Sequence, residues 1–492
     1  MAKALMIQGT MSNAGKSLVA AALCRIFSQD GYKCAPFKSQ NMALNSFITK
    51  DGLEIGRAQA MQAEAAGIEP SVYMNPVLLK PTTDIGSQVI VNGKVRGNMR
   101  ATDYFKYKKQ LVPEIMKAYK MLEAENDIIV IEGAGSPVEL NLKSDDIVNM
   151  GMAELADAAV LLVGDIDRGG VFAQLLGTLW LLDKAERKRV KGLIVNKFRG
   201  DIGLFRDGVK ILEEKGKVPV AGVIPYMNID IDDEDSLSEK LLNTKASKID
   251  IAVIRLPKLS NFTDFDVFLQ YDGISVRYVS EPDKLGNPDM IIIPGTKSTI
   301  SDMQSIRNSG MEVEIRNCAE SGIPVFGICG GYQIMGRKIS DPYNTECGGE
   351  IDGMGLLDIE TIFERQKTRM QVSGQIKNIG GIFSELSGKR FDGYEIHLGR
   401  TVCSGKPLAL LSSGKTDGAW SGNIYGSYVH GIFDSKEISE TIMKVLFKNK
   451  GLKFSGTSFS RKDYKEKQYD LLAETVRKNI DMKLVYNSML PL

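Results

Sequence analysis

The sequence feature that most constrains the fold is a tight turn around Cys329, between an expected strand and an expected helix. The apolar run Ile323–Phe326 predicts the strand, and Tyr332–Met335 begins the helix. Glycine on both sides of Cys329 allows a strained backbone and close approach of a substrate. The helix amino terminus has a positive dipole end, which favours a thiolate. We therefore interpret Cys329 as a nucleophile on an α/β sheet rather than as a buried structural cysteine.

The residues around this turn resemble a known family. Gly327–Gln333 reads Gly-Ile-Cys-Gly-Gly-Tyr-Gln, which is similar to the G-x-C-x-G-x-Q motif of class I glutamine amidotransferases. Members of that family hydrolyse glutamine through a cysteinyl thioester and release ammonia. The resemblance implies that Cys329 is the nucleophile and that Gln333 helps to hold glutamine.

A second glycine loop precedes the cysteine in the chain. Met290–Ile293 predicts a strand, and Pro294–Ser298 follows it. This loop resembles the one that completes the oxyanion hole in class I amidotransferases. The resemblance implies that Gly295 and Gly330 contribute backbone N–H groups to a tetrahedral intermediate.

The chain contains two histidines, His397 and His430. Each is expected at the end of a strand, so either is a candidate for the base. The chain order of the family favours His430, and His397 stays open as the alternative. The family usually has an acid two residues after the histidine, but Ile432 stands there. The third member of the triad is therefore missing or supplied from elsewhere, and a cysteine–histidine pair can suffice.

The amino-terminal half begins with a nucleotide-binding pattern. Ala4–Ile7 predicts a buried strand, Gly9–Ser17 is a glycine loop ending in Lys-Ser, and a helix rich in Ala and Leu follows. This order predicts a phosphate-binding loop in which Lys16 reaches the β and γ oxygens and Ser17 ligates Mg²⁺. The residues expected to contact ATP in this loop are Gly9, Asn13, Gly15, Lys16 and Ser17.

The loop is one residue longer than the common phosphate-loop pattern, and this spacing resembles dethiobiotin synthetase and its relatives. Asp127–Ile131 predicts a buried strand that ends at Glu132, where an acid is placed to ligate Mg²⁺. Glu-Gly-Ala-Gly at this strand end also resembles dethiobiotin synthetase. Asn196 follows another strand, and in related nucleotide enzymes an Asn at this place holds the base. We therefore expect Asn196 to contact adenine.

Two polar stretches at strand ends are candidates for binding the acceptor substrate, because open α/β sheets bind ligands at the carboxyl ends of their strands. Gln40 and Asn41 lie in the first stretch. Asp165, Asp167 and Arg168 lie between glycines in the second, which indicates a substrate or metal site. The alternatives are an ordinary surface loop for the first and helix capping by Asp for the second.

A chain of 492 residues is too long for one core. Alternating strands and helices predict two doubly wound α/β domains. The expected segments are a phosphate-loop amidoligase domain at 1–228, a linker at 229–248, an amidotransferase domain at 249–447 and a charged helical extension at 448–492.

The overall composition excludes several classes. A net charge of +1 argues against a nucleic-acid-binding or membrane-surface protein. Six irregularly spaced cysteines favour neither a zinc site nor a disulfide framework, and they fit a reducing cytosol. No apolar stretch has the length of a membrane span.

A dethiobiotin-synthetase-like domain joined to a class I amidotransferase domain resembles the cobyrinic acid amidating enzymes of vitamin B12 synthesis, and within these the cobyric acid synthase family. The similarity runs from Met1 to about Phe447. It implies that ATP, Mg²⁺ and glutamine are used to amidate the b, d, e and g carboxylates of adenosylcobyrinic acid a,c-diamide.

Three alternatives remain open. The first is the a,c-diamide synthase, and the second is a glutamine-dependent ligase acting on peptidoglycan or a nucleotide. The third is a partner-regulated phosphate-loop ATPase. Such proteins have a lysine early in the loop and lack the cysteine turn, whereas this chain has no lysine between Gly9 and Ala14 and has the turn at Cys329.

Overall fold

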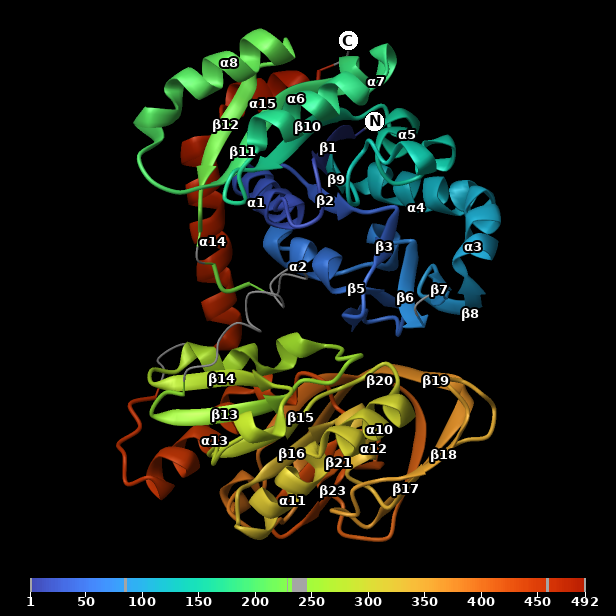
Figure 1. The fold of residues 1–492 in the computed structure, drawn as a ribbon, viewed down its shortest axis with the longest axis vertical. Helices are drawn as coiled ribbons and strands as arrows, with labels where there is room; N and C mark the ends of the chain where they lie inside the picture. Colours follow the sequence, from blue (N-terminus) through green and yellow to red (C-terminus); the bar gives the residue numbers. More distant parts are fainter. Residues whose placement is uncertain (1, 84–85, 228, 232–245, 457–459, 491–492) are drawn as a thin grey trace. The chain divides into compact units, whose positions relative to one another are not determined.

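The structure, a computed structural model, describes residues 2–83, 86–227, 229–231, 246–456 and 460–490. The chain forms two compact units (Figure 1). The first consists of Met1–Ala43, Glu54–Asp235 and Tyr464–Leu492, and the second of Leu44–Leu53 and Ser236–Asp463. Most of the expected linker at 229–248 lies outside the described residues. None of the helices in the described residues is long and apolar enough to cross a membrane.

The first unit is built on a sheet of parallel strands in the order β12-β11-β10-β1-β9-β2. The strands are β1 (Lys3–Gly9), β2 (Cys34–Phe37), β9 (Ile128–Glu132), β10 (Ala159–Asp165), β11 (Val190–Phe198) and β12 (Val220–Pro225). Their sequences are mostly apolar, as expected for strands of a parallel sheet that helices cover on both faces. The strand order reverses beside β1, which places a ligand-binding crevice at its carboxyl end.

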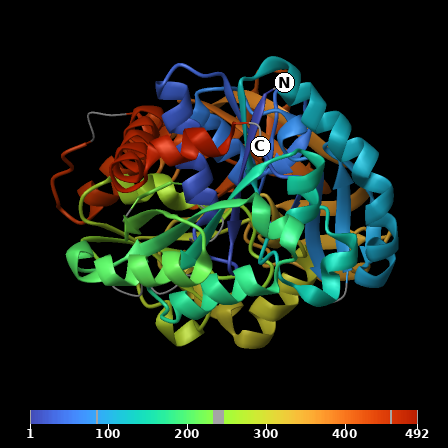
Figure 2. The same ribbon diagram turned by 90° about the horizontal axis from the view of Figure 1, so that it is seen from above.

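Two helical layers cover this sheet, as two separate apolar clusters show. One layer contains α4 (Val112–Glu125), α5 (Met150–Leu155), α6 (Val171–Leu181) and α8 (Arg206–Gly216). The other contains α1 (Lys16–Gln29), α2 (Arg57–Ala66), α14 (Arg461–Asn479) and α15 (Met482–Ser488). The carboxy-terminal helices α14 and α15, red in Figures 1 and 2, pack beside α1, where the rings of Phe27 and Tyr486 lie 5.5 Å apart. Thus the charged tail contributes to the core of the first unit.

This unit contains further elements outside these layers. They are a four-stranded sheet of β3 (Gln40–Met42), β6 (Val77–Thr83), β7 (Gly86–Val91) and β8 (Lys94–Arg100), together with β5 (Glu54–Gly56), α3 (Ala101–Tyr107) and α7 (Lys184–Arg189).

The second unit has a sheet in the order β14-β13-β15-β16-β24-β23, parallel except for the edge pair of β23 and β24. Its strands are β13 (Ile249–Ile254), β14 (Ile274–Val279), β15 (Met290–Ile293), β16 (Val325–Ile328), β23 (Ala419–Ser421) and β24 (Ile424–Ser427). Its helices are α10 (Thr299–Ser309), α11 (Met311–Glu320), α12 (Gly330–Ile334) and α13 (Lys436–Asn449). The predicted fold class of two α/β domains is therefore confirmed.

A second, largely antiparallel sheet completes this unit. It contains β17 (Lys338–Asp341), β18 (Gly349–Asp352), β19 (Ile359–Ile376), β20 (Arg390–Cys403), β21 (Ala409–Leu411) and β22 (Thr416–Asp417). The short strand β4 (Ser46–Ile48) also belongs to this unit. His397 lies inside β20, so the prediction that it ends a strand is wrong. The strand continues because β19 pairs with it beyond His397, as far as Cys403.

Candidate active sites

Cys329 occupies a strained turn between β16 and α12. Its φ of 51° and ψ of −107° are rare for a residue with a side chain. Its N–H donates to the Ser427 carbonyl at 2.8 Å, which ties the turn to the neighbouring strand β24. A Cβ added at Gly331 would lie 1.9 Å from the Ile293 carbonyl oxygen. Glycine is therefore required next to the cysteine, because the end of β15 lies against the turn.

The predicted glycine loops and His430 come together at this turn. A Cβ at Gly330 would lie 2.7 Å from Cγ2 of Thr296, within the Pro294–Ser298 loop. A Cβ at Gly295 would lie 3.1 Å from Cε1 of His430. These residues follow β15, β16 and β24, which are adjacent in the sheet. The carboxyl ends of adjacent parallel strands thus bring four predicted residues to one place.

A buried carboxylate holds His430. Oδ2 of Asp264 lies 2.6 Å from Nδ1 of His430, and both side chains are buried. Asp264 lies in the 3-10 helix η6 (Phe262–Gln270). Burial alone would lower the pKa of His430, but the charges of Asp264 and Cys329, with a hydrogen bond from each, raise it to about 10. The cluster therefore favours the imidazolium form of His430.

His397 has a different environment. Its Nδ1 lies 2.7 Å from the Gly399 carbonyl oxygen, and its ring stacks on Tyr428 with centroids 3.7 Å apart. Its Nε2 lies 3.8 Å from a carboxylate oxygen of Glu395. Its neighbour Ile396 is closer to the nucleophile, because the Ile396 carbonyl lies 3.7 Å from Sγ of Cys329. His397 therefore lies near the site, while the cysteine–histidine–carboxylate arrangement uses His430.

The side chain of Gln333 is fixed at both ends of its amide. Its Nε2 donates to the Tyr428 hydroxyl at 3.0 Å, and its Oε1 accepts from Thr299 at 3.2 Å. A Cβ at Gly399 would lie 2.3 Å from Nε2 of Gln333. Gln333 is therefore a rigid part of the wall beside Cys329, as a residue that positions glutamine would need to be.

The phosphate loop of the first unit follows β1 and begins α1. Lys16 folds back over the loop, and its Nζ donates to the Met11 carbonyl at 2.9 Å. A Cβ at Gly9 would lie 3.0 Å from the Lys16 side chain, so glycine is needed for this approach. Gly15 and Asn13 both have positive φ, of 93° and 62°. The loop therefore has the irregular backbone that directs N–H groups towards an anion.

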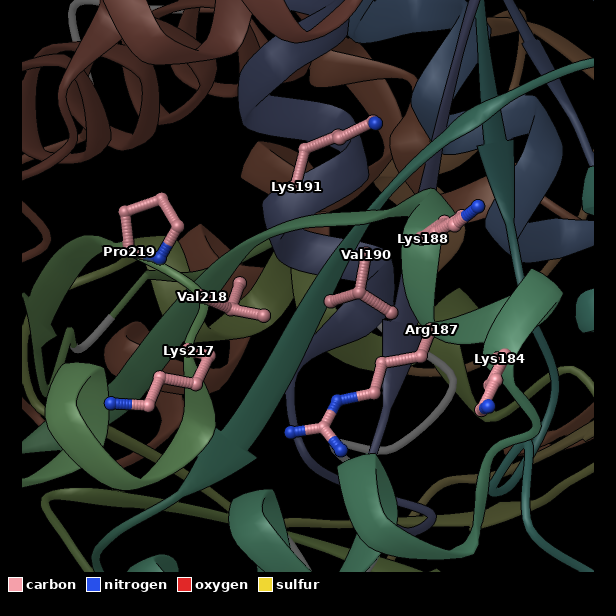
Figure 3. Close-up of a pocket in the computed structure, with 8 residues that line it drawn as sticks. All are labelled: Lys184, Arg187, Lys188, Val190, Lys191, Lys217, Val218 and Pro219. Carbon is pink, nitrogen blue, oxygen red and sulfur yellow. The ribbon is translucent and has the colours of Figure 1, made fainter.

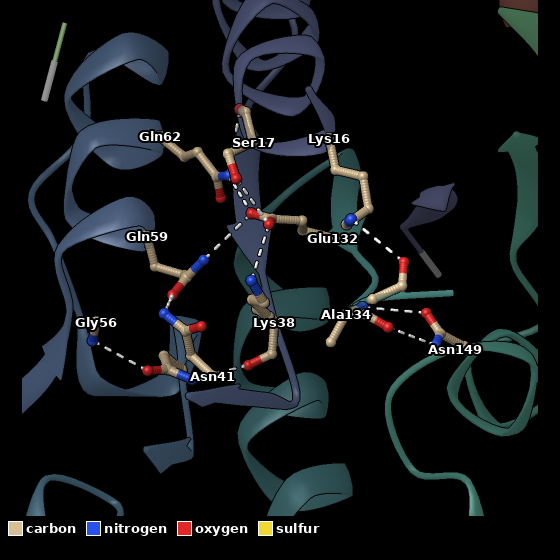
Figure 4. Close-up of polar contacts among 12 residues, drawn as sticks. Lys16, Ser17, Lys38, Asn41, Gly56, Gln59, Gln62, Glu132, Ala134 and Asn149 are labelled. Atoms are coloured by element: carbon tan, nitrogen blue, oxygen red, sulfur yellow. Dashed lines mark hydrogen bonds and ion pairs between the residues drawn. The ribbon is translucent and has the colours of Figure 1, made fainter. Parts of the chain in front are cut away.

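Glu132 is the centre of a buried polar cluster beside this loop (Figure 4). Its carboxylate accepts from Ser17 Oγ at 2.9 Å, from Lys38 Nζ at 2.8 Å and from Gln62 Nε2 at 2.6 Å. Gln59 donates to it at 3.4 Å. Burial alone would raise the pKa of Glu132, but the charge of Lys38 and these hydrogen bonds hold it below its ordinary value. Glu132 is therefore ionised beside the phosphate loop.

This donor set fits a magnesium ion. The described residues contain no group of three or more His, Cys, Asp or Glu side chains that could hold a metal. Mg²⁺ is usually held by one or two carboxylates together with substrate phosphates and water. Glu132 and Ser17, in hydrogen-bond contact beside the loop, provide that kind of partial set.

Asn196 is buried and its amide donates to the Ala14 carbonyl at 2.9 Å. It therefore touches the phosphate loop, and its contact with adenine stays a prediction. The first candidate acceptor residues, Gln40 and Asn41, lie in β3. Asn41 donates to Gln59 at 3.3 Å, and Gln40 accepts from the Tyr104 hydroxyl.

The second stretch of candidate acceptor residues is an ionic group. Asp165 is fully buried, with Nζ of Lys197 3.3 Å from its Oδ2. Its Oδ1 accepts from the Asp167 N–H at 2.8 Å, and Nε of Arg168 lies 3.9 Å from its Oδ2. Asp167 itself pairs with Arg199 at 2.6 Å. Their role in binding the acceptor stays a prediction.

Comparisons with known proteins extend over the whole chain. The family model of the CobQ/CobB/MinD/ParA nucleotide binding domain matches residues 5–241. The model of the CobB/CobQ-like glutamine amidotransferase domain matches residues 250–438. The chain is 55% identical to a cobyric acid synthase of Lachnoclostridium phytofermentans, with 99% of both chains covered. The chain belongs to the cobyric acid synthase family.

Other members of the cobyric acid synthase family show the same extent of similarity. The protein of Ruminiclostridium cellulolyticum is 57% identical, with 99% of this chain and 97% of that protein covered. The protein of Alkaliphilus metalliredigens is 52% identical, with 98% and 99% covered. The chain is thus an enzyme, a glutamine-hydrolysing ligase with a nucleotide-binding domain and an amidotransferase domain.

Sequence reasoning missed three residues of these sites. Lys38 belongs to the polar stretch after β2, which its place at a strand end could have indicated, whereas Gln62 lies inside helix α2. Asp264 had no such signal, because it lies in a short 3-10 helix 166 positions before His430.

A basic cavity of about 450 Å³ lies elsewhere in the first unit (Figure 3). It is lined by Lys184, Arg187, Lys188, Val190, Lys191, Lys217, Val218 and Pro219. Val190 begins β11 and Pro219 directly precedes β12, so the cavity is at the amino ends of these strands. The phosphate loop is at the carboxyl end of β1, in the same parallel sheet. The cavity therefore has no part in the nucleotide site.

Proposed function

We propose that the chain uses ATP and glutamine to amidate the b, d, e and g carboxylates of adenosylcobyrinic acid a,c-diamide, giving adenosylcobyric acid. The observation that carries this proposal is the presence of two complementary sites in one chain of the cobyric acid synthase family. One has a cysteine, a histidine and a carboxylate, and the other has a phosphate loop with an ionised glutamate.

In the amidotransferase unit, Sγ of Cys329 attacks the side-chain amide carbon of glutamine. The resulting oxyanion accepts hydrogen bonds from the Gly295 and Gly330 N–H groups. The protonated His430 gives its proton to the leaving nitrogen, and ammonia departs from a thioester. Water activated by His430 then hydrolyses the thioester to glutamate. Asp264 keeps the proton on Nδ1 and stabilises the imidazolium, which leaves Nε2 directed at the reaction.

In the nucleotide-binding unit, the acceptor carboxylate attacks the γ-phosphorus of ATP, and ADP leaves. The product is an acyl phosphate, whose phosphate is a better leaving group than an oxide. Mg²⁺, held by Ser17 and Glu132, would neutralise charge on the phosphates. Lys16 binds the β and γ oxygens, and ammonia then displaces phosphate from the acyl carbon to form the amide.

The paired charges around Glu132 support this assignment. Lys38 compensates Glu132 at 2.8 Å with both side chains buried, and such a pair costs much less than an isolated buried charge. A bound cation would compete with Lys38 for the carboxylate and free its ammonium for an anionic group. The acceptor carboxylate is such a group.

Mass spectrometry of corrinoid products tests the proposal. The chain is incubated with ATP, Mg²⁺, glutamine and adenosylcobyrinic acid a,c-diamide, and the amide additions are counted. We expect four additions, with none if ATP or the nitrogen source is omitted. No addition to this substrate, together with two additions at a and c when cobyrinic acid is supplied instead, would identify a diamide synthase and contradict the proposal.

A further inference from the structure

The segment Leu44–Leu53 belongs to the amidotransferase unit although its neighbours in the chain belong to the nucleotide-binding unit. Ala43 is held by the Leu79 carbonyl at 3.0 Å, and Glu54 pairs with Lys80 at 2.7 Å. Both ends of the segment are therefore anchored in the first unit. Among the described residues before Ser236, these ten are assigned to the second unit and the others to the first.

Within the second unit, the segment contacts the residues that hold His430. Oδ1 of Asn45 accepts from the Asn261 N–H at 2.6 Å, and both residues are buried. The Asn261 amide donates to the Tyr394 hydroxyl at 3.0 Å, and that hydroxyl donates to the Ser46 carbonyl at 3.3 Å. The ring of Phe47 also lies 5.7 Å from that of Tyr394.

Tyr394 and Asn261 each lead directly to the proposed base. The Tyr394 ring stacks on His430 with centroids 5.3 Å apart, and the two backbones exchange hydrogen bonds of 2.9 and 3.1 Å. Asn261 has a φ of 52° at the start of η6, and its carbonyl accepts from the Asp264 N–H at 3.2 Å. Asn45 therefore supports both groups that orient the imidazole, the stacked ring and the carboxylate.

We propose that Leu44–Leu53 is a positioning element for glutamine hydrolysis, in which Asn45 fixes His430 through Asn261 and Tyr394. The inference rests on the proposed function. It adds that the nucleotide-binding unit governs glutamine hydrolysis through this segment, because the unit holds both of its ends. The first end follows Asn41, which contacts Gln59 and through it Glu132. The backbone between Asn41 and Asn45 therefore connects the phosphate site to the segment, and ligand binding at that site can change the position of Asn45.

Asn45→Ala is the decisive variant, because it removes the acceptor for a buried N–H. Asn45→Asp keeps an oxygen at that place and is the conservative rescue. Tyr394→Phe keeps the ring beside His430 and removes the hydroxyl. The assay measures glutamate release by the full chain, with and without ATP and the corrinoid acceptor, and ammonia-dependent amidation in parallel.

For Asn45→Ala we expect kcat for glutamate release to fall about tenfold, as for loss of one buried hydrogen bond. KM for glutamine changes less than twofold, because the hydrogen bonds of Asn45 lead to the groups that orient the base. The ratio of the rates of glutamate release with and without ATP and acceptor falls towards one. Tyr394→Phe behaves similarly, Asn45→Asp stays near wild type, and ammonia-dependent amidation stays within twofold in all three.

Four results would overturn the inference alone. The first two are unchanged glutamate release in Asn45→Ala, and a loss of ammonia-dependent amidation in that variant equal to its loss of glutamate release. The third is glutamate release by Asn45→Asp as low as that of Asn45→Ala. The fourth is wild-type glutamate release at the same rate with and without ATP and acceptor. A wild-type chain that releases no glutamate under any of these conditions would instead overturn the proposed function, and the inference with it.

Discussion

Replacing Asp264 with asparagine removes the carboxylate beside His430 and keeps the size of the side chain. In the folded chain, the charges of Asp264 and Cys329 outweigh burial and bring the pKa of His430 from 6.5 to about 10. A hydrogen bond to a charged group contributes about 1.5–3 kcal/mol, and one pKa unit corresponds to about 1.4 kcal/mol. Asp264→Asn should therefore lower the pKa of His430 by about one to two units.

The sign of the pH effect follows from this shift. The imidazolium is lost as pH rises through its pKa, so the alkaline limb of glutamate release should move to lower pH in Asp264→Asn. The stability from the Asp264–imidazolium pair is fully present below about pH 6.5 and is lost as pH rises towards 10. The difference in free energy of unfolding between wild type and variant should therefore shrink over that interval.

The rate should fall as well. The equivalent change in a serine-protease triad lowers kcat about 10⁴-fold, because the imidazole adopts the wrong tautomer. A thiol needs less help than a hydroxyl, since part of it is ionised near neutral pH. We therefore expect a loss of about 10²-fold in kcat for glutamate release.

The assay is glutamate release against pH at saturating glutamine, with ATP and acceptor present. Ammonia-dependent amidation reports on the other unit and should change little. Asp250→Asn is the matched control, because Asp250 is a buried carboxylate bonded to Arg277 at 2.6 and 2.7 Å. It lies at the amino end of β13, whereas Cys329 follows the carboxyl end of β16. An unshifted alkaline limb and a kcat within twofold of wild type in Asp264→Asn would refute the role of the carboxylate.

Three further predictions concern the division of labour between the units. Cys329→Ser should abolish glutamine-dependent amidation and leave ammonia-dependent amidation, whereas loss of both in a variant with a native circular dichroism spectrum would contradict separate sites. Lys16→Ala and Glu132→Gln should each lower amidation at least tenfold with either nitrogen source, because charge on the phosphates is no longer balanced. Near-normal ammonia-dependent turnover in either variant would mean that the nucleotide site lies elsewhere. His430→Ala should abolish glutamate release and His397→Ala should lower it much less, and the reverse result would assign the base to His397.

Local sequence patterns were sufficient to predict the fold class and most of the candidate site residues. The phosphate loop and the cysteine turn are continuous in sequence, and their chemistry depends on backbone conformations that glycine and a following helix specify. The position of Glu132 could also be predicted from the sequence, because an acid that ends a buried strand lies where parallel sheets bind their ligands. The two α/β domains follow from the same alternation of strands and helices.

Features that join distant parts of the chain were decided only by the tertiary structure. The family pattern has an acid two residues after the histidine, but Ile432 stands there in this chain, and the carboxylate beside the imidazole is Asp264. The segment at 448–492 is predicted from its charge to be a helical extension, yet Tyr469 and Leu472 of α14 are buried in the core. Leu44–Leu53 reads as an ordinary polar loop and belongs to the other unit. Such contacts depend on strand order and packing between elements far apart in sequence, and no local propensity encodes them.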